Sequence, residues 1–177
     1  MDFGALSAWK AGLSELLLQD QARVWMYIAS RDLSEEECRA VEETMATFVK
    51  GWEAHGKALK AQSQLLNGQI LILALDESHQ PATGCSIDAS VAAIRSLSEF
   101  LPDVDWLNRS WVLHEPLPPH VPGDKWQRSS LHDFWAMCKA NNVPADTQVL
   151  DSTVATLGDL KGRGVVSLSD SWHASMW

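Results

Sequence analysis

The dipeptide Asn67-Gly68 lies between two segments that both have strand character, and it limits how they can pair. Both residues tolerate the positive φ that a two-residue type I′ hairpin turn requires. Residues 57–66 alternate polar and apolar side chains, whereas residues 69–76 are apolar on both faces. The sequence therefore predicts a β-hairpin with one edge arm and one buried arm.

Two helices are predicted on either side of this hairpin. Ser34 followed by Glu37 is typical of a capping box at a helix start. The second helix is expected to begin near Cys85, with Ser86 as its N-cap, and to end before Pro102. Helical spacing predicts two buried faces, Cys38, Val41, Met45, Phe48 and Trp52 in the first helix and Ile87, Val91, Ile94, Leu97 and Leu101 in the second.

The order of these elements indicates an α+β fold. Residues 23–29 are apolar on both faces and predict a central strand, and residues 110–114 predict a fourth strand. Strand, helix, hairpin, helix and strand together give the ferredoxin-like βαββαβ order, in which the first and third strands are central. The sheet face opposite the two helices then needs a cover, either from the C-terminal residues or from a second copy in a homodimer.

We expect residues 1–177 to form a single domain. Residues 1–20 would be a helical lead-in, with Leu6, Trp9, Leu13, Leu16 and Leu17 at helical spacing. Residues 22–115 would be the ferredoxin-like core, and residues 115–123 a proline-rich loop. Residues 124–177 would be a C-terminal α/β extension that packs on the core, with a helix over 130–140 and a short strand over 147–150.

Composition restricts the classes of partner. The net charge of −9 disfavours nucleic-acid binding, and no apolar run reaches the roughly 20 residues that a membrane span needs. Three widely spaced cysteines and the lack of a basic N-terminal segment favour a reducing, cytoplasmic location. Nine tryptophans indicate core and interface packing, with a tryptophan-lined ligand pocket as the alternative. No cofactor or small-molecule ligand can be named.

Residues 51–58, GWEAHGKA, approach the phosphate-binding P-loop pattern but depart from it in two ways. The final position is Ala58, so the hydroxyl that binds magnesium is absent. The segment is also predicted to leave a helix and enter a strand, which is the reverse of the P-loop context. The sequence therefore argues against nucleotide hydrolysis here.

Four segments, RVWMYIASRDLSEEE, GWEAHGKALKAQ, ATGCSIDASV and DSWHASMW, resemble a family of small uncharacterised bacterial proteins that are often labelled ABC transporter ATPases. The resemblance runs from about Arg23 to the end of the chain. It implies no activity, because a true Walker A motif and an LSGGQ-type signature are both missing from this sequence.

Cys85 is the residue that points most directly to chemistry. It is predicted at the N-terminus of a helix, where unpaired N–H groups and the helix dipole favour a thiolate. His79 precedes it in the same loop, and His55 and His173 belong to two other motifs, so the candidate catalytic set is Cys85, His79, His55 and His173. Asp88 opposes a thiolate, and the competing interpretation is that Cys85 is a buried structural residue.

Two further possibilities stay open. Asp76, His79, Cys85 and Asp88 could converge on a metal ion with His55 or His173, although their spacing matches no established zinc pattern. At the level of function, the favoured hypothesis is a ligand- or protein-binding module, with a homodimer as one form of it. The alternative is an enzyme or redox-active protein that uses Cys85 with a nearby histidine.

Overall fold

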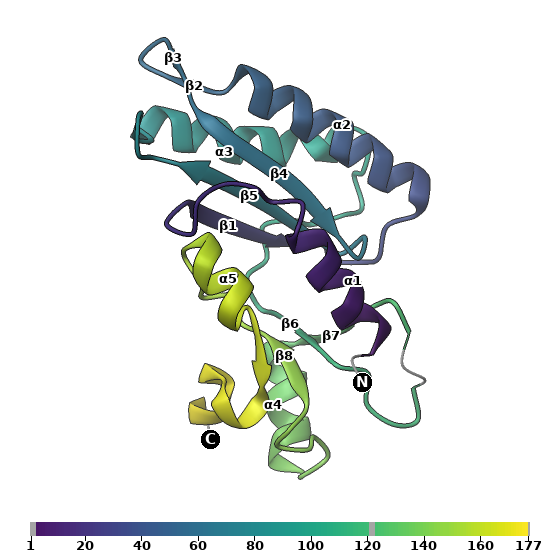
Figure 1. The fold of residues 1–177 in the computed structure, drawn as a ribbon. Helices are drawn as coiled ribbons and strands as arrows, with labels where there is room; N and C mark the ends of the chain where they lie inside the picture. Colours follow the sequence, from purple (N-terminus) through teal and green to yellow (C-terminus); the bar gives the residue numbers. More distant parts are fainter. Residues whose placement is uncertain (1–2, 121–122, 177) are drawn as a thin grey trace.

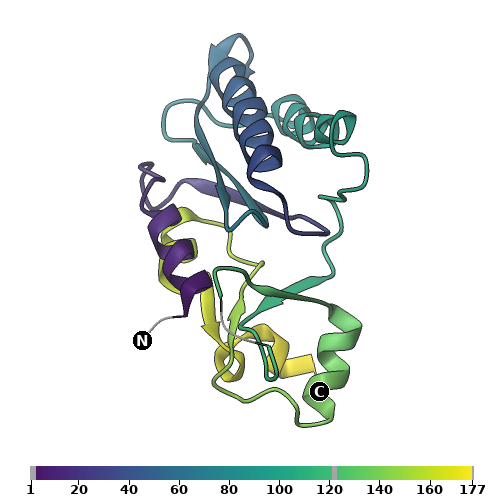
Figure 2. The ribbon, with the colours of Figure 1, turned by 90° about the vertical axis from the view of Figure 1, so that its right-hand side faces the viewer.

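The computed structural model describes residues 3–120 and 123–176, and within them the protein is a mixed α+β fold (Figures 1 and 2). Residues 1–2, 121–122 and Trp177 belong to the predicted lead-in, loop and C-terminal motif and lie outside the described residues. In chain order the elements are α1 (Gly4–Leu13), β1 (Arg23–Ile28), α2 (Glu35–Gly51), β2 (Glu53–Ala54), β3 (Lys57–Ala58), β4 (Lys60–Leu66), β5 (Ile70–Asp76), α3 (Gly84–Ser96), η1 (Leu97–Glu99), β6 (Trp111–His114), β7 (Gln127–Ser130), α4 (Leu131–Lys139), β8 (Gln148–Leu150), α5 (Leu157–Arg163), β9 (Val165–Ser167), η2 (Leu168–Asp170) and η3 (Trp172–Met176).

The predicted hairpin is confirmed from Lys60 onward, whereas Lys57 and Ala58 at the start of its predicted first arm form β3 and pair with β2. β4 and β5 pair in antiparallel register from Leu66 opposite Ile70 to Lys60 opposite Asp76. Asn67 and Gly68 have φ values of 57° and 63°, as a type I′ turn requires. β5 is buried along its whole length in the middle of the sheet β1-β5-β4, and β4 is the edge arm.

The position of β1 corrects the sequence prediction of a central strand. Among the described residues β5 is the only strand that pairs with β1, and an isolated antiparallel bridge joins Arg23 to Thr156 on the other side, so β1 is an edge strand. Both of its faces contribute to buried clusters, which explains why its sequence is apolar on both faces. Apolar residues on both faces of a strand indicate that both faces are buried. They do not indicate whether the two edges of the strand are hydrogen-bonded to neighbouring strands.

The predicted fourth strand lies in a different sheet. β6 pairs with β7 and β8 in a second antiparallel sheet with the order β7-β6-β8-β9. β1, β5 and β4 are in the relative order that a ferredoxin-like sheet has, but β6 does not occupy the place beside β1, so that topology is not confirmed. β6 has a neighbour on each edge, with four residue pairs to β7 and the pair His114–Val149 to β8.

The two long helices pack on one face of the sheet β1-β5-β4. The capping box of Ser34 and Glu37 is confirmed at the start of α2. α3 begins earlier than predicted, with Thr83 as its N-cap and Ser86 as the partner in a capping box. In α3 the buried residues are Ser86, Ser90 and Ile94, and the predicted inward residues Ile87 and Val91 are only half-buried.

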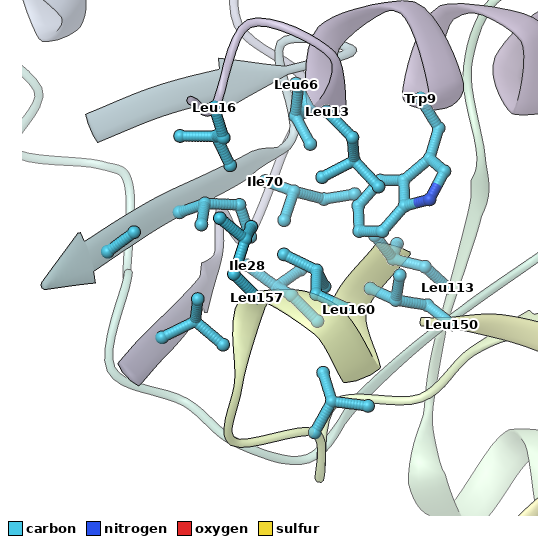
Figure 3. Close-up of a cluster of buried hydrophobic side chains, with 14 of the residues drawn as sticks. Trp9, Leu13, Leu16, Ile28, Leu66, Ile70, Leu113, Leu150, Leu157 and Leu160 are labelled. Atoms are coloured by element: carbon cyan, nitrogen blue, oxygen red, sulfur yellow. The ribbon is translucent and has the colours of Figure 1, made fainter. Parts of the chain in front are cut away.

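The opposite face of this sheet is covered within the chain itself (Figure 1). α1 lies across it, and α5 approaches the same face from the C-terminal side. Figure 3 shows the resulting cluster, to which the first sheet, α1, α5 and the second sheet all contribute. The labelled members are Trp9, Leu13, Leu16, Ile28, Leu66, Ile70, Leu113, Leu150, Leu157 and Leu160. Helical spacing predicts Leu17 on the same face, but Leu17 is 81% exposed, because α1 ends at Leu13.

Residues 23–101 form one lobe and residues 111–120 and 123–176 another; the two meet at this cluster, and we call them the N-terminal and C-terminal lobes. In the C-terminal lobe, the predicted helix over 130–140 and strand over 147–150 correspond to α4 and β8. The sequence does not predict β7, α5 and β9, which have four, seven and three residues. None of the described helices combines the length and apolar composition needed to cross a membrane.

Candidate functional site

Cys85 lies on the surface in the first turn of α3, and its thiol is free. The interpretation of this residue as buried is therefore wrong. His79 is also exposed, in the loop that joins β5 to α3. Within residues 3–120 and 123–176 no hydrogen bond joins Cys85 to a histidine.

His55 lies in the turn between β2 and β3, exposed and with a positive φ of 53°. This turn is connected to the start of α3, because the Trp52 indole N–H donates to the Ser86 carbonyl over 2.8 Å. The segments GWEAHGKALKAQ and ATGCSIDASV therefore meet in space. Gly51 is the last residue of α2 and Lys57 the first of β3, which confirms the helix-to-strand context of the P-loop-like segment.

His173 is placed far from these residues, in the C-terminal lobe. The β2–β3 turn and the C-terminus lie at opposite ends of the molecule in Figure 1. His173 is 1% exposed, stacks on Trp172 with 3.9 Å between ring centroids and contacts the Phe134 ring edge. Burial lowers its pKa to about 4. His173 thus belongs to the packing of its lobe, and the four candidate residues do not form one site.

His114 has no role in the sequence prediction, yet it is fully buried near His173. Its Nδ1 lies 2.8 Å from the Glu115 carbonyl oxygen and its Nε2 2.9 Å from the Ser129 hydroxyl. Burial lowers its pKa. With both ring nitrogens engaged, His114 has no nitrogen left for a substrate. The part of the chain that the structure describes also contains no group of three or more His, Cys, Asp or Glu side chains arranged to hold a metal ion.

A different region has the properties of a binding site. A hollow of about 520 Å³ runs along β1 and is lined by residues from four parts of the chain, which we call the β1-edge hollow. Its lining is Arg23, Val24, Trp25, Met26, Tyr27, Ile28, Trp106, Leu107, Asn108, Arg109, Ser152, Thr153, Val154, Ala155 and Trp172.

The main chain of β1 alternates between its partner strand and this hollow. The amide of Ala29 donates to the Gln69 carbonyl, next to the pairing with β5, so odd-numbered residues direct their N–H and C=O groups to β5. Even-numbered residues direct theirs outward. Among the described residues, the outward amides of Met26 and Ile28 have no main-chain partner, and they lie where the lining of the hollow includes both residues.

The two ends of this outward edge are already occupied. The Val24 amide donates to the Ala155 carbonyl over 3.0 Å, at the loop before α5. The Ser30 amide donates to the Asp105 carbonyl over 3.0 Å, after η1. The open stretch therefore lies between two fixed points, and it is the place that the fourth strand of a ferredoxin-like sheet would take beside β1.

A second, larger hollow of about 910 Å³ lies between α1 and the C-terminal lobe. Its lining carries Lys10 and Lys161 together with Glu115 and Asp146, so its charges are mixed. The Lys161 amine already donates to the Leu16 carbonyl over 2.8 Å. The larger hollow is lined by residues of α1 and of the C-terminal lobe. The β1-edge hollow differs from it because the main-chain groups of Met26 and Ile28 there have no main-chain partner among the described residues. We therefore take the smaller hollow as the candidate site.

No family model, no curated protein and no solved structure matches the chain. Function is therefore inferred from the geometry of the β1-edge hollow. Sequence patterns could not have found this site, because the apolar pattern of β1 does not reveal whether its edge is paired.

Proposed function

We propose that the protein is a protein-binding module that receives an extended segment of a partner polypeptide along the free edge of β1. The outward main-chain groups of Met26 and Ile28, which have no main-chain partner among the described residues, carry this proposal. A segment added beside β1 would supply those hydrogen bonds, as in other cases of β-strand addition. An unpaired strand edge is a template for such pairing.

The dimensions of the open edge fit a short strand. From Val24 to Ser30 the chain advances six steps, which is roughly 20 Å at about 3.3 Å per residue. This length accommodates an added strand of about five residues, the commonest strand length. Trp25, Trp106 and Trp172 line the same hollow and offer apolar area to alternate side chains of the segment.

Two related statements belong to this proposal. We place the protein in the cytoplasm, in keeping with three free thiols among the described residues. We also infer that it acts by binding and not as an ATPase, and the resemblance to proteins labelled as ABC transporter ATPases contributes no activity to it. An enzyme or redox-active protein that uses Cys85 is the alternative, favoured by the exposure of the thiol.

The proposal is tested by selecting binders from a displayed library of random heptapeptides on the full-length protein. Met26→Pro removes one outward N–H and leaves the hydrogen bonds to β5 in place, since proline is tolerated on the outer side of an edge strand. Met26→Ala is the matched control, because it keeps the N–H. We expect selected peptides to bind Met26→Pro about tenfold or more weakly than Met26→Ala.

Hydrogen exchange gives a second measurement if Met26→Pro does not fold, as judged by circular dichroism. A bound peptide should then slow amide exchange at Met26 and Ile28 in the unsubstituted protein. Cys85→Ser should leave peptide binding unchanged, whereas dependence on the thiol would favour the alternative. The proposal fails if no peptide is recovered, or if the recovered peptides bind Met26→Pro as well as they bind Met26→Ala.

A further inference from the structure

The charged residues that line the β1-edge hollow are all basic. The lining includes Arg23 and Arg109, and no aspartate or glutamate belongs to it among the described residues. This is unusual for a chain with 23 acidic and 14 basic residues and a net charge of −9. A locally positive lining in an acidic protein selects a negatively charged partner.

The two arginines are not neutralised by the protein itself. Arg23 lies over the Trp25 ring, 4.6 Å from its centroid, and neither Arg23 nor Arg109 forms an ion pair within residues 3–120 and 123–176. Three arginines outside the lining form ion pairs, Arg31 with Glu37 and Asp103, Arg128 with Asp32, and Arg163 with Asp151, whereas Arg39 and Arg95 form none within the described residues. The guanidinium groups at the hollow are therefore available to carboxylates from outside.

Acidic residues next to the hollow are engaged elsewhere. Asp105 accepts the Leu107 amide through Oδ1 over 2.8 Å. Asp151 accepts the Thr153 amide over 2.9 Å and pairs with Arg163. Asp151 is thus paired with an arginine outside the lining, and Asp105 forms no ion pair with Arg23 or Arg109 within the described residues.

Two further hydrogen-bond donors at the hollow lack acceptors. The indole N–H groups of Trp106 and Trp172 are buried and have no partner among the described residues. Trp106 is 4% exposed, so water cannot readily satisfy its N–H. Buried donors without acceptors favour a ligand that brings acceptor oxygens.

We infer that the segment received along β1 is acidic, with carboxylates that pair with Arg23 and Arg109 while its main chain pairs with Met26 and Ile28. This inference rests on the proposed function and specifies the partner. The hollow supplies N–H donors and cations along one strand edge, and an extended segment rich in aspartate or glutamate supplies the complementary groups.

A second copy of the chain is a poorer occupant of the same edge. Residues 23–28 contain no aspartate or glutamate, so a second β1 edge would bring no carboxylate of its own to Arg23 and Arg109. Sedimentation equilibrium distinguishes the two cases, and an Arg23-dependent homodimer through β1 would contradict the inference.

The experiment uses the peptides that are selected on the full-length protein and that lose affinity in Met26→Pro. Their composition is compared with that of the starting library, and the tightest peptide is resynthesised with glutamine at each acidic position. We expect an excess of aspartate and glutamate among the selected peptides. Each carboxylate replaced should weaken binding about fivefold at low ionic strength, with a smaller effect in high salt.

The arginine variants locate this effect on the protein. In Arg23→Gln/Arg109→Gln, the acidic peptide and its glutamine counterpart should bind equally. Arg39→Gln/Arg95→Gln is the matched control, since it removes the same charge from exposed arginines outside the lining. In Arg39→Gln/Arg95→Gln the preference for the acidic peptide over its glutamine counterpart should persist.

The outcomes separate this inference from the function on which it rests. Selected peptides that depend on Met26 but show no acidic excess, or a preference that survives in Arg23→Gln/Arg109→Gln, would overturn the acidic partner and leave the strand-binding function standing. Failure to recover any peptide that depends on Met26 would overturn both.

Discussion

At the scale of single residues, the surroundings of His173 decide its protonation. The ring lies between Trp172 and Phe134 in the C-terminal lobe and is 1% exposed. Burial is the main cause of its lowered pKa; the Asp151 carboxylate acts in the opposite direction, and His114 adds to the lowering. The folded protein therefore favours the neutral ring, while the unfolded chain takes up a proton near the usual pKa.

This difference predicts a pH dependence of stability. Since the folded-state pKa of about 4 lies below the usual 6.5, the contribution of His173 is present above pH 6.5 and is lost as the pH falls from 6.5 to about 4. The shift corresponds to a loss on the order of 3 kcal/mol. Urea unfolding across this range should show a shallower decline in His173→Gln than in the unsubstituted protein. His79→Gln, at an exposed histidine, is the control and should leave the slope unchanged; an unchanged slope in His173→Gln would contradict the prediction.

At the scale of elements, the β4–β5 turn depends on residues that accept a positive φ. Gly68 has a φ of 63°, and a Cβ at this position would lie 2.9 Å from the Lys125 amine and 3.2 Å from the Cys38 sulfur. The turn is also tied to other segments, because the Asn67 side-chain amide donates to the carbonyls of Ala5 and Asp124. Turn geometry and tertiary contacts thus act together at one corner of the hairpin.

Gly68→Ala should therefore lower the free energy of unfolding by about 1–2 kcal/mol, from the strained backbone and the crowded Cβ. Gly51→Ala is the matched control. Gly51 is helical and a Cβ added there would meet nothing within 4 Å, so its replacement should be neutral or slightly stabilising. Chemical denaturation of both variants measures the difference, and equal stabilities would show that the turn does not need a glycine.

At the scale of the whole molecule, the two lobes share one hydrophobic cluster. Leu157 and Leu160 of α5 pack in the same cluster as Ile70 and Ile72 of β5 and Trp9 of α1 (Figure 3). α5 is also joined to the segment before β1, since the Leu157 amide donates to the Ala22 carbonyl over 2.8 Å. Because this cluster belongs to neither lobe alone, we expect the lobes to unfold together.

Leu157→Ala should cost about 2–5 kcal/mol, because it leaves a cavity at a fully buried position. Leu17→Ala is the control, since Leu17 is 81% exposed and should cost little. Urea unfolding is followed by far-ultraviolet circular dichroism and by tryptophan fluorescence. The two signals should remain coincident in Leu157→Ala, whereas two separated transitions would mean that each lobe folds by itself.

Local chemistry is enough to predict much of the N-terminal lobe. The Ser34–Glu37 capping box, the helix spacing through Met45, the Asn67-Gly68 turn and the buried strand after it all depend on neighbours within a few residues. The sequence also predicts that another segment packs on the open face of the sheet, because an apolar face has to be buried against another element. These features follow from periodicity and backbone preference, which are properties of the sequence itself.

Only the tertiary structure decided which strand edges are paired and which side chains meet. β6 has the sequence of a strand, but its partners β7 and β8 come from later in the chain, and their choice leaves the edge of β1 open. The exposure of Cys85 and the burial of His173 also depend on which distant segments pack against these residues. Strand pairing and burial depend on contacts between residues far apart in sequence, and those contacts are fixed by the packing of the whole chain.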